Sequence, residues 1–426
     1  MNYHEALHFL NSLVNFEMDR QKKYERMNYN IERMKELSWL MGNPENKMKI
    51  FHVAGTNGKG SVSTMFYTLL INNHVPAGLY ISPHVKDIQE RIQANGKIIS
   101  EKDFAHAVEK VREAAAKMED HPTYFEALTA AAMFYFDKAG CHWACLETGL
   151  GGRLDSTNAY NTDITCITSI SLDHTDKLGS AIEEIAAEKA GIIKPNTPLI
   201  VGKMEDSAMQ VINGKAKTQN AEVSVFGRDF NAGQNTVFAK DHTFFNFMPG
   251  NYKLTVPVTG IKIPESASLA FFALKKFYPH ALPDFTGLEL PARMTLLHQN
   301  PDIFVDGAHN PGAAAILSQS LKAIYPDKKF HFLCAFLADK DHLSVIKEIT
   351  EIAETITLTK IPHPSDNSAM AFSDTKKLFE NVFFTEHPGT YLQQIKEENI
   401  PDNVYIICGS FYLAAEILKC FSEYFR

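Results

Sequence analysis

The stretch VAGTNGKGSVSTMFYTLL, residues 53–70, decides how the first half of the chain folds. It continues the apolar run KIFHVAG, which predicts a buried strand that ends in a tight turn. The segment SVSTMFYTLL behind it predicts a helix. Backbone N–H groups of a glycine-rich turn at a helix N-terminus bind phosphate. A phosphate loop built around Gly55, Gly58 and Gly60 is therefore expected.

Two side chains of this loop fit a nucleotide. Lys59 is placed to meet the outer phosphates, and Ser61 lies where the hydroxyl of a phosphate loop approaches magnesium. The order G-T-N-G-K-G-S departs from the usual GxxxxGK(S/T) pattern, because one residue separates the lysine from the serine. A tight glycine-rich turn without a ligand therefore stays open as an alternative.

Length and composition are those of a folded globular protein. The 426 residues are enough for two or three domains, and 45% apolar with 22% charged residues disfavours disorder and repeats. The net charge of -8, without a long run of Lys or Arg, predicts no nucleic-acid partner. A negatively charged substrate would need a local basic pocket.

The cysteines and the apolar segments indicate the compartment. The six cysteines show no CxxC pairing, which is typical of buried free thiols in a reducing cytoplasm. The start MNYHEALHFLNSLV does not resemble a signal peptide. No segment approaches the ~20 apolar residues that span a bilayer. We expect a cytoplasmic protein without membrane contact, and a monomer because no oligomer signal stands out.

The pattern along the chain predicts an α/β fold with two domains. From about residue 48 to 200, short apolar runs alternate with amphipathic stretches, which favours a mostly parallel sheet flanked by helices. The segments EVSVFGRDF and HTFFNFMPGNYKLTVPVTG, between about 221 and 260, predict a small antiparallel subsidiary sheet. Residues 1–284 are therefore expected to form a phosphate-loop domain with a mixed parallel sheet.

A second domain is expected behind the proline-rich segment KKFYPHALPDFTGLELPARM. Strand and helix patterns alternate again from DIFVDGAHNP onward, with helices predicted in GAAAILSQSLKAIY, DHLSVIKEITEIAE, SDTKKLFENV and FYLAAEILKCF. This rhythm predicts a smaller Rossmann-like α/β domain over residues 285–426.

One lysine lies on the wrong face of a predicted helix. In LGSAIEEIAAEKAGIIKP, Ser180 and Glu183 have the spacing of a capping box, which predicts a helix start. The apolar positions that follow place Lys189 on the core-facing stripe. Three explanations stay open: the side chain snorkels to solvent, it pairs with a buried acid, or its pKa is depressed for chemistry.

Polar residues also follow two of the predicted strands. Glu147 ends the strand in ACLETG, and Asp173 and His174 follow the strand in SISLDHTD. Ligands of open α/β sheets bind outside the carboxyl ends of the strands, beside the predicted phosphate loop. Each residue alone is more typical of a hydrogen-bonded loop, but together with the phosphate loop they favour a magnesium–nucleotide site.

Several ordered segments carry a family resemblance. They are HVAGTNGKGS, SPHVKDIQERI, TYFEALTAAAMFYF, ETGLGGRLDSTN, SLDHTDKLGSAIEEIAAEKAGIIKP, LPARM, DGAHNP and ADKD, with a weaker match in CGSFYL. Together they resemble the folylpolyglutamate synthase/dihydrofolate synthase family, a branch of the Mur ligase superfamily. The loop order G-T-N-G-K-G-S is the form that this family uses.

The resemblance implies an ATP-dependent amide ligase with a Mur ligase central-type ATP-binding domain and a C-terminal ligase domain. The cofactors would be ATP and Mg²⁺, and the substrates a reduced folate or dihydropteroate together with L-glutamate. ATP would phosphorylate the folate or pteroate carboxylate, and the glutamate amine would attack the acyl phosphate. A carboxylate is a poor acceptor, so charge neutralisation by Mg²⁺ and lysine suits the reaction.

The resemblance also implies roles for individual residues. The catalytic residues would be Lys59, Lys189 and His174, with Lys189 carbamylated. The nucleotide would be held by Gly55, Thr56, Asn57, Gly58, Lys59, Gly60, Ser61, Arg293, Asp306 and His309. The metal ligands would be Ser61, Ser82, Glu147 and His174. The folate would lie against Thr123, Phe125, Glu126 and Asp155.

Two positions depart from the family pattern. Ser266 stands about where the family has an asparagine near adenine, and Asn30 stands where the family tends to have glycine beside the pterin site. The dihydrofolate synthase activity is therefore less firmly implied than the polyglutamylating one.

Three other functions are considered. A Mur ligase of cell-wall synthesis is disfavoured because those enzymes lack DGAHNP and have a different loop. A nucleotide-binding module without catalysis is disfavoured by the presence of Lys59, Glu147, His174 and Lys189. A small-molecule kinase would release a stable phosphorylated product without needing an amine.

Overall fold

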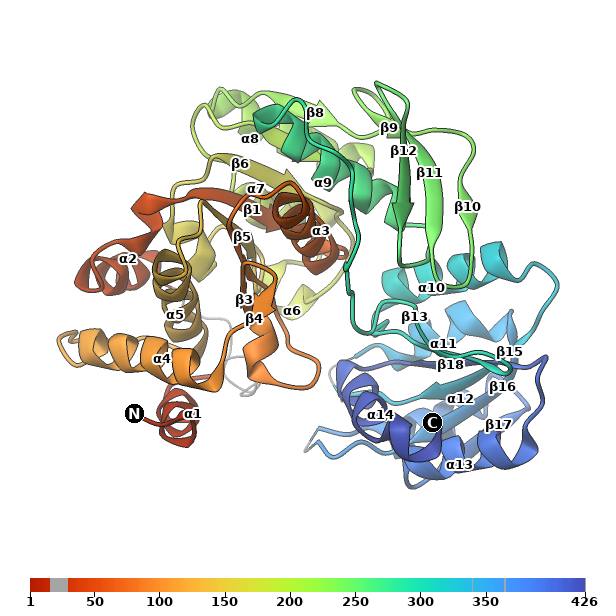
Figure 1. The fold of residues 1–426 in the computed structure, drawn as a ribbon. Coiled ribbons are helices and arrows are strands. Elements are labelled where there is room, and N and C mark those ends of the chain that lie inside the picture. The colour runs from red at the N-terminus through yellow and green to blue at the C-terminus, as the bar shows by residue number, and fades with distance from the viewer. Residues whose placement is uncertain (16–29, 339, 364, 426) are drawn as a thin grey trace.

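The computed structural model describes residues 1–15, 30–338, 340–363 and 365–425 and holds two α/β units (Figure 1). The N-terminal unit extends to the end of α9 at Phe277, and the C-terminal unit begins with β13 at Thr295. Among the described residues, no helix has both the length and the apolar character to cross a membrane.

The N-terminal unit is built on an eight-stranded sheet with the order β4-β3-β2-β5-β1-β6-β7-β8. The other strands lie on either side of β1 (Lys49–Ala54), which pairs in parallel with β5 (Trp143–Glu147) and β6 (Ile164–Ile167). The remaining strands are β2 (Ala77–Tyr80), β3 (Ile92–Ala94), β4 (Lys97–Ile98), β7 (Leu199–Val201) and β8 (Val223–Val225). The predicted parallel-dominated sheet is confirmed, and its topology forms a ligand crevice outside the carboxyl ends of the strands.

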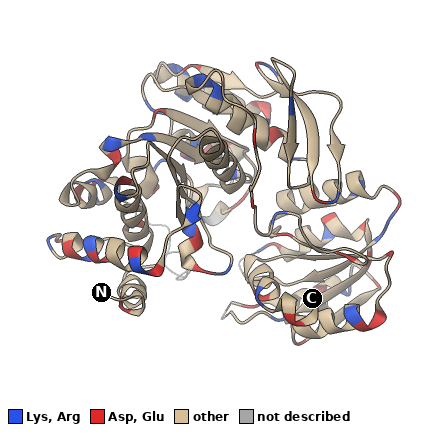
Figure 2. Ribbon diagram, in the orientation of Figure 1, with Lys and Arg blue, Asp and Glu red and all other residues tan. Residues whose placement is uncertain are grey.

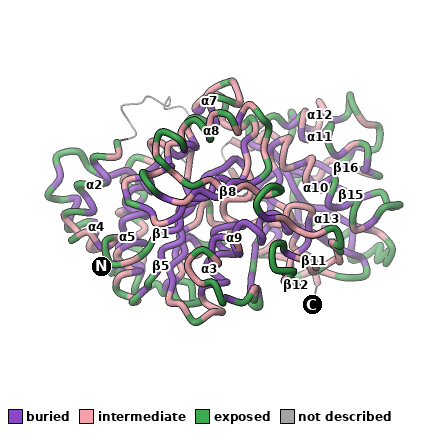
Figure 3. The backbone as a smooth tube through the Cα atoms, turned by 90° about the horizontal axis from the view of Figure 1, so that it is seen from above, coloured by how far each residue is buried: buried purple, intermediate pink, exposed green. Residues whose placement is uncertain are grey.

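Alternate side chains of β1 enter two separate cores, as the two-residue period of a strand requires. Phe51 and Val53 pack with α3 (Lys59–Asn72) and α9 (Ile263–Phe277), whereas Ile50 packs on the opposite face. The helices on that face are α1 (Tyr3–Ser12), α2 (Ile31–Leu40), α4 (Glu101–Ala115) and α5 (Tyr124–Lys138). Figure 3 shows β1 and β5 as continuous buried segments between these layers.

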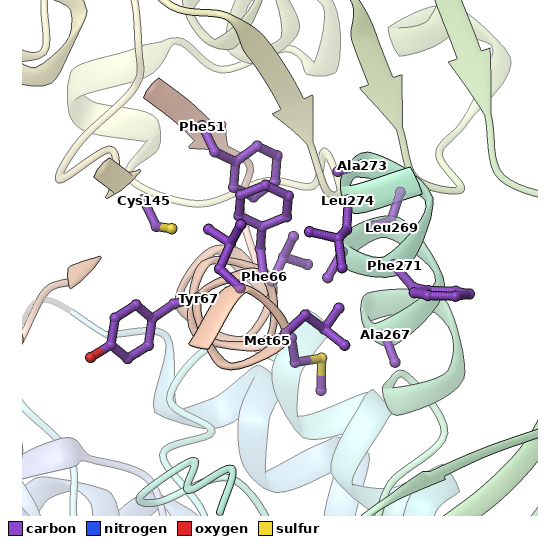
Figure 4. Packing of buried hydrophobic residues seen from close by; sticks show 14 of the residues in the cluster. Phe51, Met65, Phe66, Tyr67, Cys145, Ala267, Leu269, Phe271, Ala273 and Leu274 are labelled. Atoms are coloured by element: carbon purple, nitrogen blue, oxygen red, sulfur yellow. The ribbon is translucent and has the colours of Figure 1, made fainter. Parts of the chain in front are cut away.

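Helix α3, which follows the phosphate loop, is buried between the sheet and α9. Every residue from Ser61 to Leu70 is buried, small hydroxyl residues included, so this part of the helix has no solvated face. Phe66 lies 4.1 Å from Phe51 and 5.5 Å from Trp143, measured between ring centroids. Figure 4 shows the rings of Phe51 and Phe66 beside the α9 residue Leu274. The core therefore fixes the axis of the helix whose N-terminus faces the loop.

The outer helix α4 has the opposite character. Lys and Arg positions lie beside Asp and Glu along it (Figure 2), with Lys110–Glu113 at 2.7 Å and Arg112–Glu109 at 2.6 Å. Exposed pairs of this kind contribute only about 0.2–0.5 kcal/mol each. The helix is therefore held mainly by its buried face, which includes Phe104.

The predicted small antiparallel sheet is present but begins later than expected. It consists of β9 (Asn231–Ala232), β10 (Val237–Phe238), β11 (Thr243–Met248) and β12 (Tyr252–Val256). The prediction was wrong for EVSVFGRDF, because its strand β8 pairs in parallel with β7 at the edge of the main sheet. Val223 and Val225 pack on the core of the adjoining helices α7 (Ile182–Ala190) and α8 (Asp206–Thr218), which draws the segment to the main sheet.

The C-terminal unit is a six-stranded sheet with the order β13-β14-β18-β15-β16-β17. Its strands are β13 (Thr295–His298), β14 (Asp302–Val305), β15 (Phe330–Cys334), β16 (Ala353–Thr359), β17 (Val382–Thr385) and β18 (Val404–Cys408). Its helices are α10 (Pro311–Ile324), α11 (His342–Thr350), α12 (Ser368–Thr375), α13 (Pro388–Glu398) and α14 (Phe411–Tyr424). β13 is antiparallel to β14 and the other pairings are parallel, which confirms the expected α/β architecture.

Two predicted helix positions were wrong in detail. The helix expected in SDTKKLFENV lies earlier, because α12 ends at Thr375 and Val382 already begins β17. The capping box expected from Ser180 and Glu183 is displaced by one residue. Glu184, not Glu183, accepts hydrogen bonds from the backbone N–H groups of Ser180 and Ala181, so α7 begins at Ile182.

Hydrogen bonds join the two units at both ends of α10 and within it. Lys240, between β10 and β11, contacts Asp302 at 2.6 Å, and the Tyr325 hydroxyl at the C-cap of α10 donates to the same carboxylate. Within α10, Ser320 Oγ accepts from the Ile261 N–H at 3.1 Å. At the other end, Asn310 reaches the N-terminal unit. Together these contacts hold α10 against the N-terminal unit.

Candidate active site

A cleft of about 1960 Å³ lies between the two units, outside the carboxyl ends of β1, β5 and β6. This is larger than the ~300–1,000 Å³ of a usual small-molecule pocket, and large enough for more than one ligand. All the predicted site residues line it except Gly55 and Lys189. The structure therefore brings together residues that are up to 250 positions apart in the chain.

The phosphate loop is anchored by residues that follow β6. Thr56 N–H donates to the Ser169 carbonyl at 2.8 Å, Asn57 N–H donates to Ser169 Oγ at 3.1 Å, and Thr168 Oγ1 donates to the Asn57 carbonyl at 2.7 Å. Neither Thr168 nor Ser169 was predicted from the sequence as a site residue. The signal was their position in CITSIS, directly after a strand that neighbours the loop.

Two glycines let this loop take its shape. Gly55 has φ +155 and a Cβ there would lie 1.9 Å from Thr168 Oγ1, so no side chain fits. Gly58 has φ +83 as the N-cap of α3, a conformation that favours glycine. Lys59 Nζ donates to the carbonyls of Gly55 and Thr56 at 3.0 and 3.2 Å, which places the ammonium over the loop.

Glu147 provides a buried carboxylate next to the loop. It is 5% exposed and accepts a hydrogen bond from the Ser82 N–H at 2.9 Å. A Cβ at Gly60 would lie 3.2 Å from its Oε2, so the start of α3 approaches it closely. Burial raises the pKa of Glu147, although Lys59, Arg293 and Arg91 act in the opposite direction. A cation beside this carboxylate would stabilise its charged form, so Glu147 fits the expected metal.

The expected metal ligands are two hydroxyls, one carboxylate and one imidazole. Among the residues that the structure describes, no three His, Cys, Asp or Glu side chains are grouped to hold a metal ion. Ser61, Ser82, Glu147 and His174 all line the cleft. Mg²⁺ is commonly bound through one or two carboxylates plus the phosphates of a substrate, and this donor set fits that mode.

His174 lies in the loop after β6 with a left-handed backbone, φ 49 and ψ 42. Its N–H donates to Asp173 Oδ1 at 2.9 Å, so the aspartate restrains this backbone conformation. Burial lowers the pKa of His174 to about 4, against the raising effect of Asp173. The imidazole is therefore neutral at physiological pH and has a lone pair available for a metal.

Lys189 is buried, as the helix pattern predicted. It is 4% exposed, which rules out the snorkelling explanation, and its Nζ donates to the Gly55 carbonyl at 2.8 Å. Burial, with a smaller effect of Lys59, lowers the pKa of Lys189 to about 7. A large share of the Lys189 amines in a population of molecules is therefore uncharged near neutral pH. The amine lies behind the phosphate loop and not at the surface of the cleft.

The C-terminal unit brings a guanidinium, a carboxylate and an imidazole to the cleft. Arg293 stacks on Phe411, with its Cζ 4.6 Å from the ring centroid. Asp306 accepts from the N–H groups of Met294 and Ala308, both at 2.8 Å, and burial raises its pKa. His309 has its Nδ1 2.8 Å from the Gly307 carbonyl, so Nδ1 carries the proton, and burial lowers its pKa to about 4.

The residues expected to bind folate gather at one side of the cleft, and most of their polar groups are already engaged. Both carboxylate oxygens of Glu126 accept from Arg33, at 2.8 and 2.9 Å, and Thr123 forms a capping box with Glu126. Asp155 accepts the N–H groups of Gly149 and Leu150. Phe125 is the member with a partly exposed ring facing the cleft.

The two positions that depart from the family pattern are also visible. Ser266 lies in the first turns of α9, and its Oγ is 3.8 Å from the position of a Cβ at Gly58. Asn30 is the N-cap of α2 and accepts from the Glu32 N–H at 3.0 Å. Ser266 is thus next to the phosphate loop, whereas Asn30 has a clear structural role in starting a helix.

Family comparison agrees with this architecture. The Mur ligase middle domain matches residues 53–273, and the Mur ligase glutamate ligase domain matches residues 292–411. A dihydrofolate synthase/folylpolyglutamate synthase of Bacillus subtilis (strain 168) is 30% identical over 413 residues, which cover 91% of this chain and 94% of the relative.

Solved structures of similar proteins share the whole fold. The folylpolyglutamate synthase of Mycobacterium tuberculosis, complexed with ADP and AMPPCP, has a TM-score of 0.86 at 26% identity, covering 93% of this chain and 96% of that one. A bifunctional folylpolyglutamate synthase/dihydrofolate synthase with Mn, AMPPNP and L-glutamate bound has a TM-score of 0.84 at 27% identity, covering 99% and 98%. With its phosphate loop and two-unit cleft, the chain belongs to the folylpolyglutamate synthase/dihydrofolate synthase family of Mur ligases and is an ATP-dependent ligase.

Proposed function

We propose that the chain adds L-glutamate to the glutamate side chain of reduced folates, with ATP as the phosphoryl donor. The observation that carries this proposal is one cleft of about 1960 Å³ lined by the phosphate loop, by Glu147 and, from the opposite unit, by Arg293. The relatives' names support the substrates: they include folylpolyglutamate synthases, one solved with an ATP analogue, manganese and L-glutamate.

The residues of the N-terminal unit would hold and activate the nucleotide. The loop from Gly55 to Ser61, including Thr56, Asn57 and Gly60, offers backbone N–H groups to the phosphates, while Lys59 neutralises their charge. Glu147, His174, Ser61 and Ser82 would hold Mg²⁺, which when bound neutralises the oxygens of the transferred phosphoryl group.

The residues of the C-terminal unit would complete the site from the other side. Arg293, held flat by Phe411, offers fixed N–H groups to phosphate, and Asp306 and His309 lie beside it to position the nucleotide. When the cleft holds all three substrates, water is largely displaced, which favours attack of the amine of glutamate on the acyl phosphate over hydrolysis. The proposed domain bounds are residues 1–284 for the ATP-binding domain and residues 285–426 for the ligase domain.

Lys189 is proposed to be carbamylated. The modification needs a neutral amine, and a pKa of about 7 supplies one. It would replace a cation behind the phosphate loop with an anion, and the neighbouring Lys59 would then stabilise it. The carbamate nitrogen keeps one hydrogen, so Nζ can still donate to the Gly55 carbonyl while the new carboxylate lies away from that oxygen.

A second ligation, of dihydropteroate with L-glutamate, is proposed for the same cleft. The relatives that carry both activities in their names support it. Phe125 would offer a stacking face to the pterin, with Thr123, Glu126 and Asp155 shaping the surrounding wall. That the chain acts as a cytoplasmic monomer without nucleic-acid or membrane partners stays a prediction.

The test measures ADP release by the purified protein with Mg-ATP and L-glutamate, using tetrahydrofolate, 5,10-methylenetetrahydrofolate or dihydropteroate as acceptor. Mass analysis should show each folate product heavier by one or more glutamyl residues. Turnover with reduced folates alone would exclude the second ligation. Turnover without glutamate would contradict the ligase proposal and favour a kinase.

A further inference from the structure

The side chain of Asn310 joins the C-terminal unit to two loops at the centre of the cleft. Its Nδ2 lies 3.2 Å from Asp173 Oδ2 and 3.5 Å from Asn57 Oδ1. Asn310 is 6% exposed, so these contacts are shielded from water. The two partners come from different loops, the phosphate loop and the loop that carries His174.

The orientation of the Asn310 amide is determined by its neighbours. Its Oδ1 accepts from the Ala313 N–H at 2.8 Å, which makes Asn310 the N-cap of α10. The NH₂ group must then face Asp173, whose carboxylate can only accept when ionised. The Asn310 side chain therefore caps a helix of the C-terminal unit with its Oδ1 and bonds to the N-terminal unit with its Nδ2.

The two partners of Asn310 belong to loops that carry residues of the site. Asp173 Oδ1 accepts the N–H of His174, and Asp173 Oδ2 accepts from Asn310. The bond to Asn310 therefore fixes the carboxylate that restrains the His174 backbone. Asn57 is anchored through its backbone to Ser169 and Thr168, so its position does not require Asn310. Close packing adds to the contact, because a Cβ at Gly312 would lie 3.5 Å from Asn57 Nδ2.

We propose that Asn310 is a positioning residue for ligation, which couples docking of the C-terminal unit to the geometry of the His174 loop. The proposal rests on the functions given above for His174 and the phosphate loop. The phosphate loop is preformed by contacts within the N-terminal unit, so its own contacts with the nucleotide do not depend on Asn310. Phosphoryl transfer and amide formation depend on it, because the His174 loop is aligned only when the units are docked.

The pair Asn310 and Asp173 allows an exchange experiment. Asn310→Asp keeps the capping oxygen of α10 but sets two carboxylates against each other. Asp173→Asn keeps an oxygen for the His174 N–H but sets two NH₂ groups against each other. The double variant Asp173→Asn/Asn310→Asp restores one donor facing one acceptor with the direction reversed. Asn310→Ser, too short to bridge, serves as a second disruptive variant.

We expect the single variants and Asn310→Ser to lower kcat about 10- to 100-fold. A displacement of about 1 Å in a site residue is enough for a loss of this size. ADP affinity, measured by calorimetry, should fall less than kcat, because the contacts of the phosphate loop stay in place while those of the C-terminal unit weaken. The double variant should regain most of the lost kcat. In solution scattering, the disrupted variants should be more expanded than the wild type with ADP, and the double variant should not.

The control is Asn2→Asp, the same substitution at another N-cap, where Asn2 accepts from the Glu5 N–H at 2.9 Å on the exposed surface. Its kcat and scattering should match the wild type. Single variants with near-normal kcat, or a double variant no better than the poorer single one, would overturn the coupling. Solution scattering measures docking of the two units without any turnover. If the wild type were inactive with every folate, the proposed function would be contradicted, and the scattering data would still test the docking.

Discussion

The ammonium group of Lys189 lies 2.8 Å from the carbonyl oxygen of Gly55, the first glycine of the phosphate loop. This bond connects helix α7 to the end of β1 across 134 positions of the chain. It also explains how an almost fully buried lysine is tolerated, because the ammonium keeps a strong acceptor while burial lowers its pKa to about 7.

Lys189→Ala should lower turnover about 10²- to 10³-fold, the scale for losing a preorganised charged group in an active site. If a carbamate is the active form, a short carboxylic acid added to the variant should restore part of the activity. Steady-state ADP release with and without added acid measures both effects.

Lys194→Ala is the matched control for this experiment. Lys194 also donates to a backbone carbonyl, that of Asn158 at 2.7 Å, and burial lowers its pKa to about 8, yet its bond is to Asn158 and not to the phosphate loop. Its turnover should stay close to that of the wild type, with no gain from added acid. Full activity of Lys189→Ala would remove the modified lysine from the mechanism.

Glu147→Gln should raise the Mg²⁺ concentration needed for half-maximal activity and lower kcat by about 10² or more. The amide keeps the shape and can still accept from Ser82, but it carries no charge for a cation. A magnesium titration of ADP release separates the two effects. An unchanged titration curve would show that another group holds the metal.

Arg33→Ala should destabilise the fold by about 3–5 kcal/mol, because it leaves the buried Glu126 carboxylate without its two bonds. Lys35→Ala, on the same helix, removes an exposed pair with Glu32, in which the two side chains are 53% and 76% exposed, and should cost at most about 1 kcal/mol. Urea unfolding of both variants gives the comparison. Similar small losses would mean that the Arg33 pair is not buried in solution.

The stability of the fold should fall below pH 6.5 in a way that depends on His52. His52 is fully buried, with Nε2 2.7 Å from Thr157 Oγ1, and burial lowers its pKa to about 3. The unfolded chain therefore takes up a proton that the folded chain does not. Stability is complete above the ordinary histidine pKa and is lost as the pH falls, by at most about 5 kcal/mol.

Unfolding free energies measured between pH 7.5 and 5 should therefore decrease more steeply for the wild type than for His52→Gln. His121→Gln, at an exposed position, provides the reference for a histidine without this burial. Parallel curves for the wild type and His52→Gln would show that other groups determine the acid sensitivity.

Local patterns in the sequence were sufficient for the phosphate loop and for the face of α7 that carries Lys189. The spacing of Gly55, Gly58 and Gly60 before a helix pattern and the helical period of about 3.6 residues in α7 both lie within short windows of the sequence. The parallel sheet could also be predicted from local patterns, because strand and helix patterns alternate along the chain.

Contacts between distant segments could not be read in this way. Glu126 was expected to meet the substrate, but Arg33, 93 positions away, occupies both of its oxygens. Thr168 and Ser169 brace the phosphate loop from more than 110 positions away. The edge strand β8 has only three residues, too few to show which sheet it joins. In each case the partner is chosen by packing that no short window of sequence contains.

The bonds at the two ends of α10 restrict how the units can move. Lys240 holds Asp302 beside the C-cap and Asn310 bonds Asp173 at the N-cap, separated by a helix of 14 residues and thus about 21 Å. Two anchored points leave a rigid body a single axis of rotation, the line between them. Val85 of the N-terminal unit packs on the C-terminal core as an apolar contact. We therefore expect substrates to enter after a rotation of the C-terminal unit about the α10 axis, in which Val85 loses its apolar contacts with the C-terminal core.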